Sequence, residues 1–394
     1  MNSKGKPTFH LIIGPPLSGK TERLMELLEE KHRLDPFSYV FVGPSGFFVR
    51  EFADKFTRRV GAIIRSNFMS VDEFAVRIYS DMNPHLLHLS REFAIELLSW
   101  ILDEMKDELE IDENILKSPR FIENTLDLIH DIKEALSENF GEMRLEGLDI
   151  SEDILKIYEK FEKRLRDLGV YDTFDAYLEI NPENLGRCEY GRYLFLDGFY
   201  DLSPALRKFL RSVIPTYEEI YMTYTEDERD IFERGATILN LFDELTKDEC
   251  TGIKEKTQCM GDQRVEFLRG IFGERWMPPP DGFLRIWKFK NHHNEVKNLV
   301  RRVKKIIISG ECSPGDVAIV TNDFLKYSKL FQREFEEYGV PYRLEGDLKL
   351  GESQTVRILT LPFRVVSSGF MVDLLLSMVD FGYVGNVDPK EFET

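Results

Sequence analysis

The amino-acid sequence predicts an α/β fold built on a parallel sheet with helices on both faces. Apolar segments of strand length alternate with amphipathic helical segments over residues 1–71. The first strand leads directly into a glycine-rich loop that opens a helix, and further apolar strands return near residues 193 and 219. This alternation is typical of doubly wound sheets.

The composition is that of a globular protein. Of 394 residues, 42% are hydrophobic and 31% are charged, and the net charge of −18 argues against an evenly basic surface for nucleic acid. No apolar run approaches the roughly 20 residues that a membrane-spanning helix needs, and the N-terminal residues lack a signal-peptide pattern. We therefore expect a soluble, cytoplasmic protein that contacts no membrane.

The four cysteines lack zinc-site spacing and are expected to be free thiols.

A phosphate-binding loop follows the first predicted strand, Phe9–Ile13. It matches the pattern G-x-x-x-x-G-K-[ST] at every fixed position and consists of Gly14, Pro15, Pro16, Leu17, Ser18, Gly19, Lys20 and Thr21. In such loops, backbone N–H groups and the start of the next helix, here near Glu22, converge on a phosphate. Lys20 would reach the β- and γ-phosphates, and the Thr21 hydroxyl would ligate Mg²⁺. The sequence therefore predicts a site for ATP and Mg²⁺.

The alternation continues after this loop. A second strand is expected at Tyr39–Val42, and Ala62–Ile64 is the candidate for a third. Ser70 and Glu73 have the spacing of a capping box, which predicts a helix start there.

A long acidic stretch then has helical periodicity, from about Ser90 to Leu185. Residues 101–190 hold 25 acidic and 11 basic side chains, a net charge of −14. Two interpretations remain open: a solvated helical insertion, or a helical domain that faces a partner.

Asp197 ends the apolar strand Tyr193–Leu196, and an acid in this place can hold Mg²⁺ through its water shell. Lys20 and Asp197 are therefore the candidate catalytic residues. Gly198 stands where a helicase-type ATPase would normally carry a glutamate as general base. Nucleotide binding should survive this difference, whereas fast hydrolysis should not. Ser203 and Pro204 then open a helix, and another strand is expected at Glu219–Tyr224.

The remainder predicts a polar helical connector and a second α/β unit. Residues 225–275 have helical character, and the proline-rich segment Met277–Gly282 is a candidate domain boundary. Helices are expected from near Asn294 to Ile307 and from Asp323 to Tyr338. The predicted strands are Leu284–Phe289, Asp316–Val320, the short edge Val340–Tyr342 and Val356–Leu359.

A basic strip stands out in this acidic chain. Residues 285–305 contain eight basic side chains and one acidic one, a net charge of +7. The residues expected on the outer face of the helix are Lys297, Arg301, Lys304 and Lys305. They could contact DNA phosphates, and a solvated helix face is the equally open alternative.

The order of these parts resembles superfamily 1 helicases of the UvrD/Rep type. The Asp-Gly-Phe at residues 197–199 is more similar to the AddB/RexB-type subunits of AddAB helicase–nucleases. The other segments that carry the resemblance are residues 14–21, 40–45, 294–296, 317–320 and 338–342.

This resemblance implies a P-loop NTPase of RecA-like fold that works on DNA ends in recombinational repair. Its partners would be an AddA-type helicase–nuclease subunit and single-stranded DNA or duplex ends. The implied parts are a nucleotide-binding domain 1A (residues 1–85 and 190–225), a 1B-like acidic insertion (86–189), a helical connector (226–282) and an incomplete 2A-like α/β domain (283–394).

Two departures bear on activity. Thr321 follows Val320 where an active helicase carries an arginine, and residues 221–227 lack a nucleotide-sensing glutamine. The chain also stops before the nuclease domain and cysteine cluster of family members, so neither nuclease activity nor an iron–sulfur cluster is expected.

The sequence therefore favours an ATP-binding, hydrolysis-impaired helicase-like subunit. One alternative is an active DNA-dependent P-loop ATPase or helicase whose base lies elsewhere, for example at Asp201 or Glu73. Another is a nucleotide-stabilised scaffold that docks a partner through its acidic helices.

Overall fold

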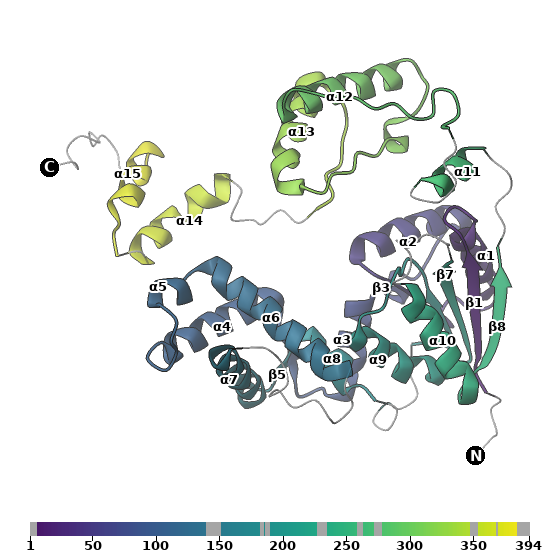
Figure 1. Cartoon of the computed structure of the whole chain (residues 1–394), viewed down its shortest axis with the longest axis horizontal. Helices are drawn as coiled ribbons and strands as arrows, with labels where there is room; N and C mark the ends of the chain where they lie inside the picture. Colours follow the sequence, from purple (N-terminus) through teal and green to yellow (C-terminus); the bar gives the residue numbers. More distant parts are fainter. Residues whose placement is uncertain are drawn as a thin grey trace. The chain divides into compact units, whose positions relative to one another are not determined.

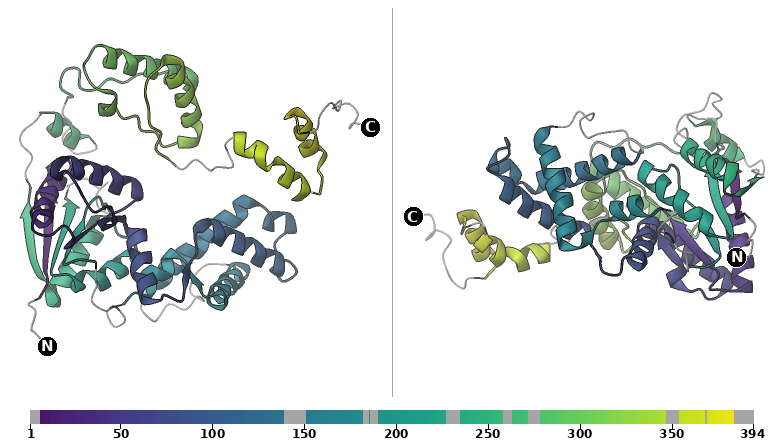
Figure 2. Two further views of the ribbon diagram at one scale, coloured as in Figure 1. Left: turned by 180° about the vertical axis from the view of Figure 1, so that it is seen from behind. Right: turned by 90° about the horizontal axis from the view of Figure 1, so that it is seen from below.

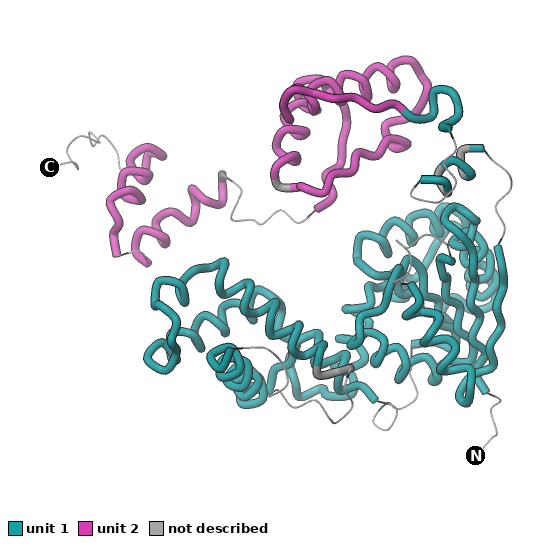
Figure 3. The backbone as a smooth tube through the Cα atoms, in the orientation of Figure 1, with its two compact units in different colours: residues 1–284 teal, residues 285–394 magenta. Residues whose placement is uncertain are grey.

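A computed structural model describes residues 6–138, 151–181, 185, 190–226, 235–257, 263–271, 278–346, 354–367 and 369–383. Residues 139–150 of the expected helical stretch lie outside this description, as do Asp227, Met277, Cys188 and Cys259. The other two cysteines, Cys250 and Cys312, are free thiols. The chain forms two compact units, residues 1–284 and 285–394, which are described separately (Figure 3).

Unit 1 is built on a parallel sheet, which confirms the predicted α/β class. Six strands pair in the order β3-β2-β6-β7-β1-β8 (Figure 1). They are β1 (Thr8–Gly14), β2 (Tyr39–Gly43), β3 (Phe68–Ser70), β6 (Tyr193–Leu196), β7 (Glu219–Thr225) and β8 (Thr251–Lys256). All pairings in this sheet are parallel.

Both faces of the central strands are apolar because helices cover both faces. In β1, Phe9, Leu11 and Ile13 point into one core, whereas Ile12 points into the other. The neighbouring strands alternate in the same way, since successive side chains of a strand point to opposite faces. The sheet is therefore buried on both sides and holds its carboxyl-terminal edge rigidly.

The two helical layers belong to different parts of the chain (Figures 1 and 2). One core contains side chains of α1 (Lys20–Leu34) and α2 (Gly46–Val60). The opposite core contains side chains of α3 (Val71–Met82), α9 (Pro204–Val213) and α10 (Ala236–Asp248). The predicted capping box is confirmed, because Ser70 and Glu73 exchange side-chain and backbone hydrogen bonds at the start of α3.

Two predictions for the sheet were wrong. The third strand is β3 rather than Ala62–Ile64, which is extended but unpaired and precedes a 3-10 turn at Arg65–Asn67. The polar stretch 225–275 is not wholly helical, since it contains β8. This edge strand carries exposed Lys and Glu side chains, which are rare in strands and give no apolar signal.

A helical insertion interrupts the sheet between β3 and β6, as predicted. Its helices are α4 (Arg91–Met105), α5 (Glu113–Leu116), α6 (Pro119–Glu138), α7 (Glu152–Leu168) and α8 (Thr173–Glu179). Buried side chains of α4 to α7 form an apolar core of their own, whereas those of α8 belong to the core against the sheet. At its base, the two-residue strands β4 (Leu87–His88) and β5 (Val170–Tyr171) pair in parallel. A further short helix, α11 (Gln263–Gly270), follows β8.

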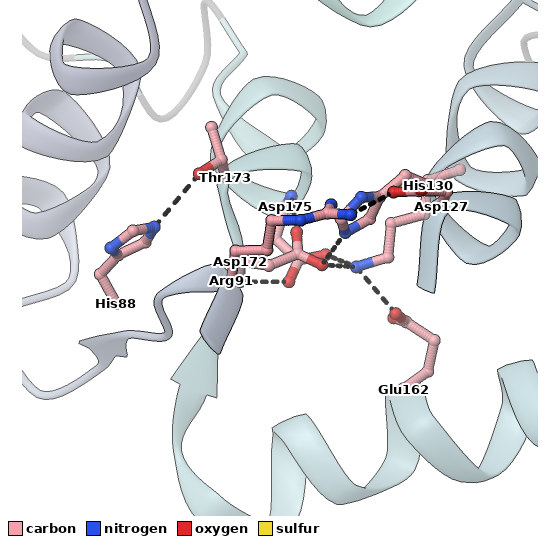
Figure 4. A network of polar contacts seen from close by, with 9 residues as sticks. His88, Arg91, Asp127, His130, Glu162, Asp172, Thr173 and Asp175 are labelled. Carbon is pink, nitrogen blue, oxygen red and sulfur yellow. Dashed lines mark hydrogen bonds and ion pairs between the residues drawn. The ribbon is translucent and has the colours of Figure 1, made fainter. Parts of the chain in front are cut away.

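A buried lysine joins three elements of this insertion (Figure 4). Lys133 on α6 is 2% exposed, and its Nζ lies 2.8 Å from Asp172 Oδ2, 2.6 Å from Asp175 Oδ1 and 2.8 Å from Glu162 Oε1. Burial raises the pKa of Asp175 to about 7, and the charge of the adjacent Asp172 adds to this effect. Lys133 thus holds α6, α7 and α8 together by compensating buried negative charge.

The described part of unit 2 consists of two helical pairs. It contains α12 (His292–Ile308), α13 (Phe324–Tyr338), α14 (Gln354–Ser367) and α15 (Val372–Asp380). Helices α12 and α13 share a small core with buried Val296, Val300, Phe331 and Phe335. The two helices predicted here are confirmed. No described helix of either unit has the length and apolarity to cross a membrane.

The strands predicted in unit 2 are not formed. Residues 284–289, 316–320 and 340–342 have no β-ladder, and residues 356–359 lie inside α14. Val317 and Ile319 still pack against α12 and α13 on one side, which explains the alternating pattern. Alternation fixes which side of an extended segment is buried, but a strand also needs a hydrogen-bonding neighbour. A second α/β domain therefore stays a prediction.

We predict that Lys133→Met destabilises the insertion by about 3–5 kcal/mol, because it leaves buried carboxylates without a cation. The midpoint of urea unfolding, followed by circular dichroism, measures this. The matched control is Lys117→Met, whose lysine makes an exposed 2.6 Å pair with Glu113 and should cost less than about 1 kcal/mol. Equal midpoints for the two variants would contradict the role of the buried network.

Candidate nucleotide site

The candidate site lies at the carboxyl-terminal edge of the sheet, where parallel α/β folds bind ligands. The phosphate loop connects β1 to α1, and Asp197 directly follows β6. Strand β7 pairs with β1 on one side and β6 on the other, so it bridges the two features. The fold thus brings together the loop and an acid that lies far along the chain.

The loop has a backbone suited to an anion. Gly19 is the N-cap of α1 with a φ of 83°, and no side chain caps the helix there. The N-cap therefore provides no side-chain acceptor for the N–H groups at the start of α1, which is the arrangement that binds phosphates. Leu17 also has a positive φ, of 61°, which is strained for a residue with a side chain. Strain of this kind is common at functional loops.

Lys20 points back onto its own loop. Its Nζ donates hydrogen bonds to the carbonyl oxygens of Gly14 and Pro15, each at 2.8 Å. The ammonium group therefore already lies in the concavity that the loop encloses. An incoming phosphate could accept these hydrogen bonds in place of the carbonyl groups, with the larger energy of a charged pair.

Asp197 is the buried acid of the site. It is 3% exposed, and its Oδ1 accepts a 2.5 Å hydrogen bond from the Thr223 hydroxyl of β7. Its Oδ2 is buried without a hydrogen-bond partner of normal geometry. Burial raises the pKa of Asp197, while the Thr223 and Thr21 hydroxyl groups and the Lys20 charge oppose this shift.

These residues fit a bound Mg²⁺ ion. An unpartnered carboxylate oxygen and the neighbouring Thr21 hydroxyl are hard oxygen ligands, which Mg²⁺ prefers. Within the described residues, no cluster of three or more His, Cys, Asp or Glu side chains could hold a metal by itself. Mg²⁺ commonly keeps waters and binds through one or two carboxylates plus phosphates.

Next to Asp197, the aromatic ring of Phe48 packs against Gly198, the position where the sequence led us to look for a general base. Gly198 has a φ of 85°, and a Cβ atom built on it would lie 2.5 Å from Phe48 Cζ. The same ring approaches Gly43 at the end of β2, where an added Cβ would lie 2.8 Å from Phe48 Cδ1. A glutamate at position 198 would therefore clash with Phe48 and adopt a strained backbone.

The alternative bases are placed as follows. The Glu73 carboxylate accepts a 2.8 Å hydrogen bond from the Ser70 N–H in the capping box of α3. Asp201 is exposed in the segment after β6. Because the Glu73 carboxylate already accepts this capping hydrogen bond, Glu73 is a weaker candidate for the general base.

The basic strip lies on α12 in unit 2. Arg301 Nε donates to Tyr338 Oη at 2.6 Å, and Lys304 Nζ donates to the Tyr338 carbonyl at 2.5 Å. These two side chains therefore attach α12 to the end of α13. Lys297 is half-buried and Lys305 is exposed. Thr321, also in unit 2, accepts a 3.2 Å hydrogen bond from the Asp323 N–H before α13.

Three residues of the site were not predicted from the sequence. Thr223 could have been found as a polar side chain inside the apolar strand β7. Phe48 and Thr257 gave no signal, because their contacts with Gly198 and Ser18 join distant parts of the chain. Such contacts follow from the pairing of strands rather than from local spacing.

Comparisons with known proteins find relatives that share one name. Three similar proteins are each named as the B-type subunit of an ATP-dependent helicase/deoxyribonuclease. That of Alkaliphilus metalliredigens is 21% identical over 94% of this chain and 35% of its own length. Those of Bacillus velezensis and Bacillus subtilis are each 22% identical, over 91% and 85% of this chain and 34% and 32% of their own lengths. The chain thus spans about a third of the length of these curated relatives.

The family model described as "ADDB, N-terminal" matches residues 11–265, from the middle of β1 into α11. This match covers more than half of the chain and includes the phosphate loop, the helical insertion and Asp197. The chain therefore belongs to the AddB N-terminal family.

Proposed function

We propose that this chain binds ATP and Mg²⁺ within a DNA end-processing helicase–nuclease and hydrolyses the nucleotide slowly. The observation that carries the proposal is the edge of the sheet where Lys20, Thr21 and the buried Asp197 come together, with Phe48 packed over Gly198. The first three residues supply binding chemistry. Phe48 and Gly198 occupy the place where a general base would activate water.

The binding step follows from these contacts. The Lys20 ammonium exchanges its two carbonyl acceptors for the β- and γ-phosphates, and the N–H groups at the start of α1 hold the same anion. Thr21 and Asp197 hold Mg²⁺, which when bound neutralises phosphate charge. Thr223 keeps the Asp197 carboxylate oriented through its 2.5 Å hydrogen bond.

Slow hydrolysis follows from the missing base. A positioned general base contributes about 10²- to 10⁴-fold to such a reaction. Gly198 has no side chain, and the Phe48 ring occupies the space into which one would project. Thr321 offers no positive charge for the γ-phosphate, which removes a second source of acceleration.

The role in DNA repair is supported by the relatives, whose names state that they are part of a helicase/deoxyribonuclease. We propose an AddA-type partner and DNA ends as substrate. Residues 1–85 and 190–225 form the RecA-like domain 1A, 86–189 the 1B-like insertion and 283–394 the 2A-like part. The connector, 226–282, also completes domain 1A, because its α10 and β8 belong to the sheet and its core. In the basic strip, Lys297 and Lys305 are better placed for DNA phosphates than Arg301 and Lys304, which bind Tyr338.

We predict that the purified chain binds Mg-ATP and that Lys20→Ala weakens binding at least tenfold, because charged hydrogen bonds to phosphate are lost. Isothermal titration measures the affinity, with the exposed Lys55→Ala on α2 as control. Phosphate release is measured in parallel with and without single-stranded DNA.

Fast, Lys20-dependent phosphate release would instead identify an active ATPase and overturn the impaired-hydrolysis proposal. Tight ATP binding with no DNA affinity at low salt would favour the scaffold alternative.

We further predict that Gly198→Glu alone leaves turnover unchanged and lowers the thermal midpoint, because its side chain meets Phe48. The double variant Phe48→Ala/Gly198→Glu should release phosphate about tenfold faster or more, since a base contributes about 10²- to 10⁴-fold. Phe48→Ala alone is the control and should show no gain. If Gly198→Glu alone were as fast as the double variant, Phe48 would not be the obstacle.

A further inference from the structure

The edge strand β8 ends beside the phosphate loop. Immediately after it, Thr257 donates its backbone N–H to the Ile13 carbonyl at 2.7 Å. Its hydroxyl donates to the same carbonyl at 3.2 Å. The β1–β8 ladder ends at the pair Ile13 and Lys256, so Thr257 makes its last hydrogen bond, at the residue before Gly14, where the loop begins.

The Thr257 hydroxyl also contacts the loop itself. Its Oγ1 lies 2.7 Å from Ser18 Oγ, and Ser18 is buried, with 8% exposure. Either hydroxyl group can be the donor in this hydrogen bond. Gly14 completes the contact, since a Cβ atom there would overlap both hydroxyl groups.

We propose that Thr257 is a positioning residue for nucleotide binding, which holds the phosphate loop in its binding shape through Ser18. This inference rests on the proposed function, because it assigns a role at the same site. Thr257 itself would not touch the nucleotide. It acts by holding Ser18, which lies between Leu17 and Gly19 in the loop.

The loop needs such an anchor when a nucleotide arrives. Lys20 donates hydrogen bonds to the Gly14 and Pro15 carbonyl oxygens and so ties the ends of the loop together. When Lys20 moves to phosphate, those hydrogen bonds are lost, while the positive φ of Leu17 continues to strain the loop. The Ser18–Thr257 contact does not involve Lys20 and can persist, so the N–H groups stay preorganised.

The coupling also runs in the opposite direction. If an ordered Thr257 favours nucleotide binding, then bound nucleotide must favour an ordered Thr257 by the same free energy. Strand β8 is an edge strand whose residues are mostly exposed. Its local stability is therefore low enough for bound nucleotide to increase it. ATP should therefore slow hydrogen exchange of the β8 amides.

The test measures Mg-ATP affinity by isothermal titration for Thr257→Val, Thr257→Ser, Ser18→Ala and Ser18→Ala/Thr257→Val in the full chain. Thr257→Val keeps the shape but removes the hydroxyl, and should weaken binding about three- to tenfold, as expected for one lost hydrogen bond. Thr257→Ser should restore affinity. In the Ser18→Ala background, Thr257→Val should add nothing, because the partner is already gone.

A control separates this role from general stability. Thr251→Val lies at the exposed opposite end of β8 and should leave ATP affinity and β8 exchange unchanged. Equal ATP affinity of the unaltered chain and Thr257→Val would overturn this inference but not the proposed function. Additive losses of ATP affinity in the double variant would do the same. Failure of the unaltered chain to bind ATP would overturn the proposed function and the inference with it.

Discussion

The parallel ladder of β6, β7 and β1 is the constraint on which the rest of the structure depends. Strand β7 pairs with Thr8–Gly14 on one side and with Tyr193–Leu196 on the other. These strands come from distant parts of the chain, and the helical insertion lies between them in sequence. Their shared direction aligns their carboxyl ends, so Asp197 and the phosphate loop meet at one edge. Without β7, neither the Thr223 hydrogen bond nor the burial of Asp197 would exist.

The proposed function separates binding chemistry from hydrolysis chemistry at this edge. Binding needs donors for phosphate and oxygen ligands for Mg²⁺, which the loop, Thr21 and Asp197 can supply. Hydrolysis also needs a base with room to project beside Asp197. The Phe48 ring and the backbone of Gly198 exclude one by sterics rather than by charge. Rotating Phe48 alone would not supply a base, because residue 198 has no side chain.

The packing of the helices in the acidic insertion depends on a different interaction, a buried cluster of ion pairs. The interior of the insertion includes the Lys133 ammonium group beside three carboxylates, those of Glu162, Asp172 and Asp175, which are labelled in Figure 4. Such a cluster contributes little net stability compared with apolar packing, yet it strongly disfavours alternative arrangements that leave a charge unpaired. Lys133 therefore fixes how α6, α7 and α8 pack, while the apolar core of the insertion supplies the driving force.

Features that depend on neighbouring residues could be predicted from the amino-acid sequence. They are the loop from Gly14 to Thr21, the capping box at Ser70 and the strand that ends in Asp197. Three other features arise only when the chain folds: β8 is a strand, Phe48 covers Gly198 and Thr257 holds Ser18. These depend on which strands become neighbours, and segments such as 316–320 show that an alternating pattern does not specify a partner.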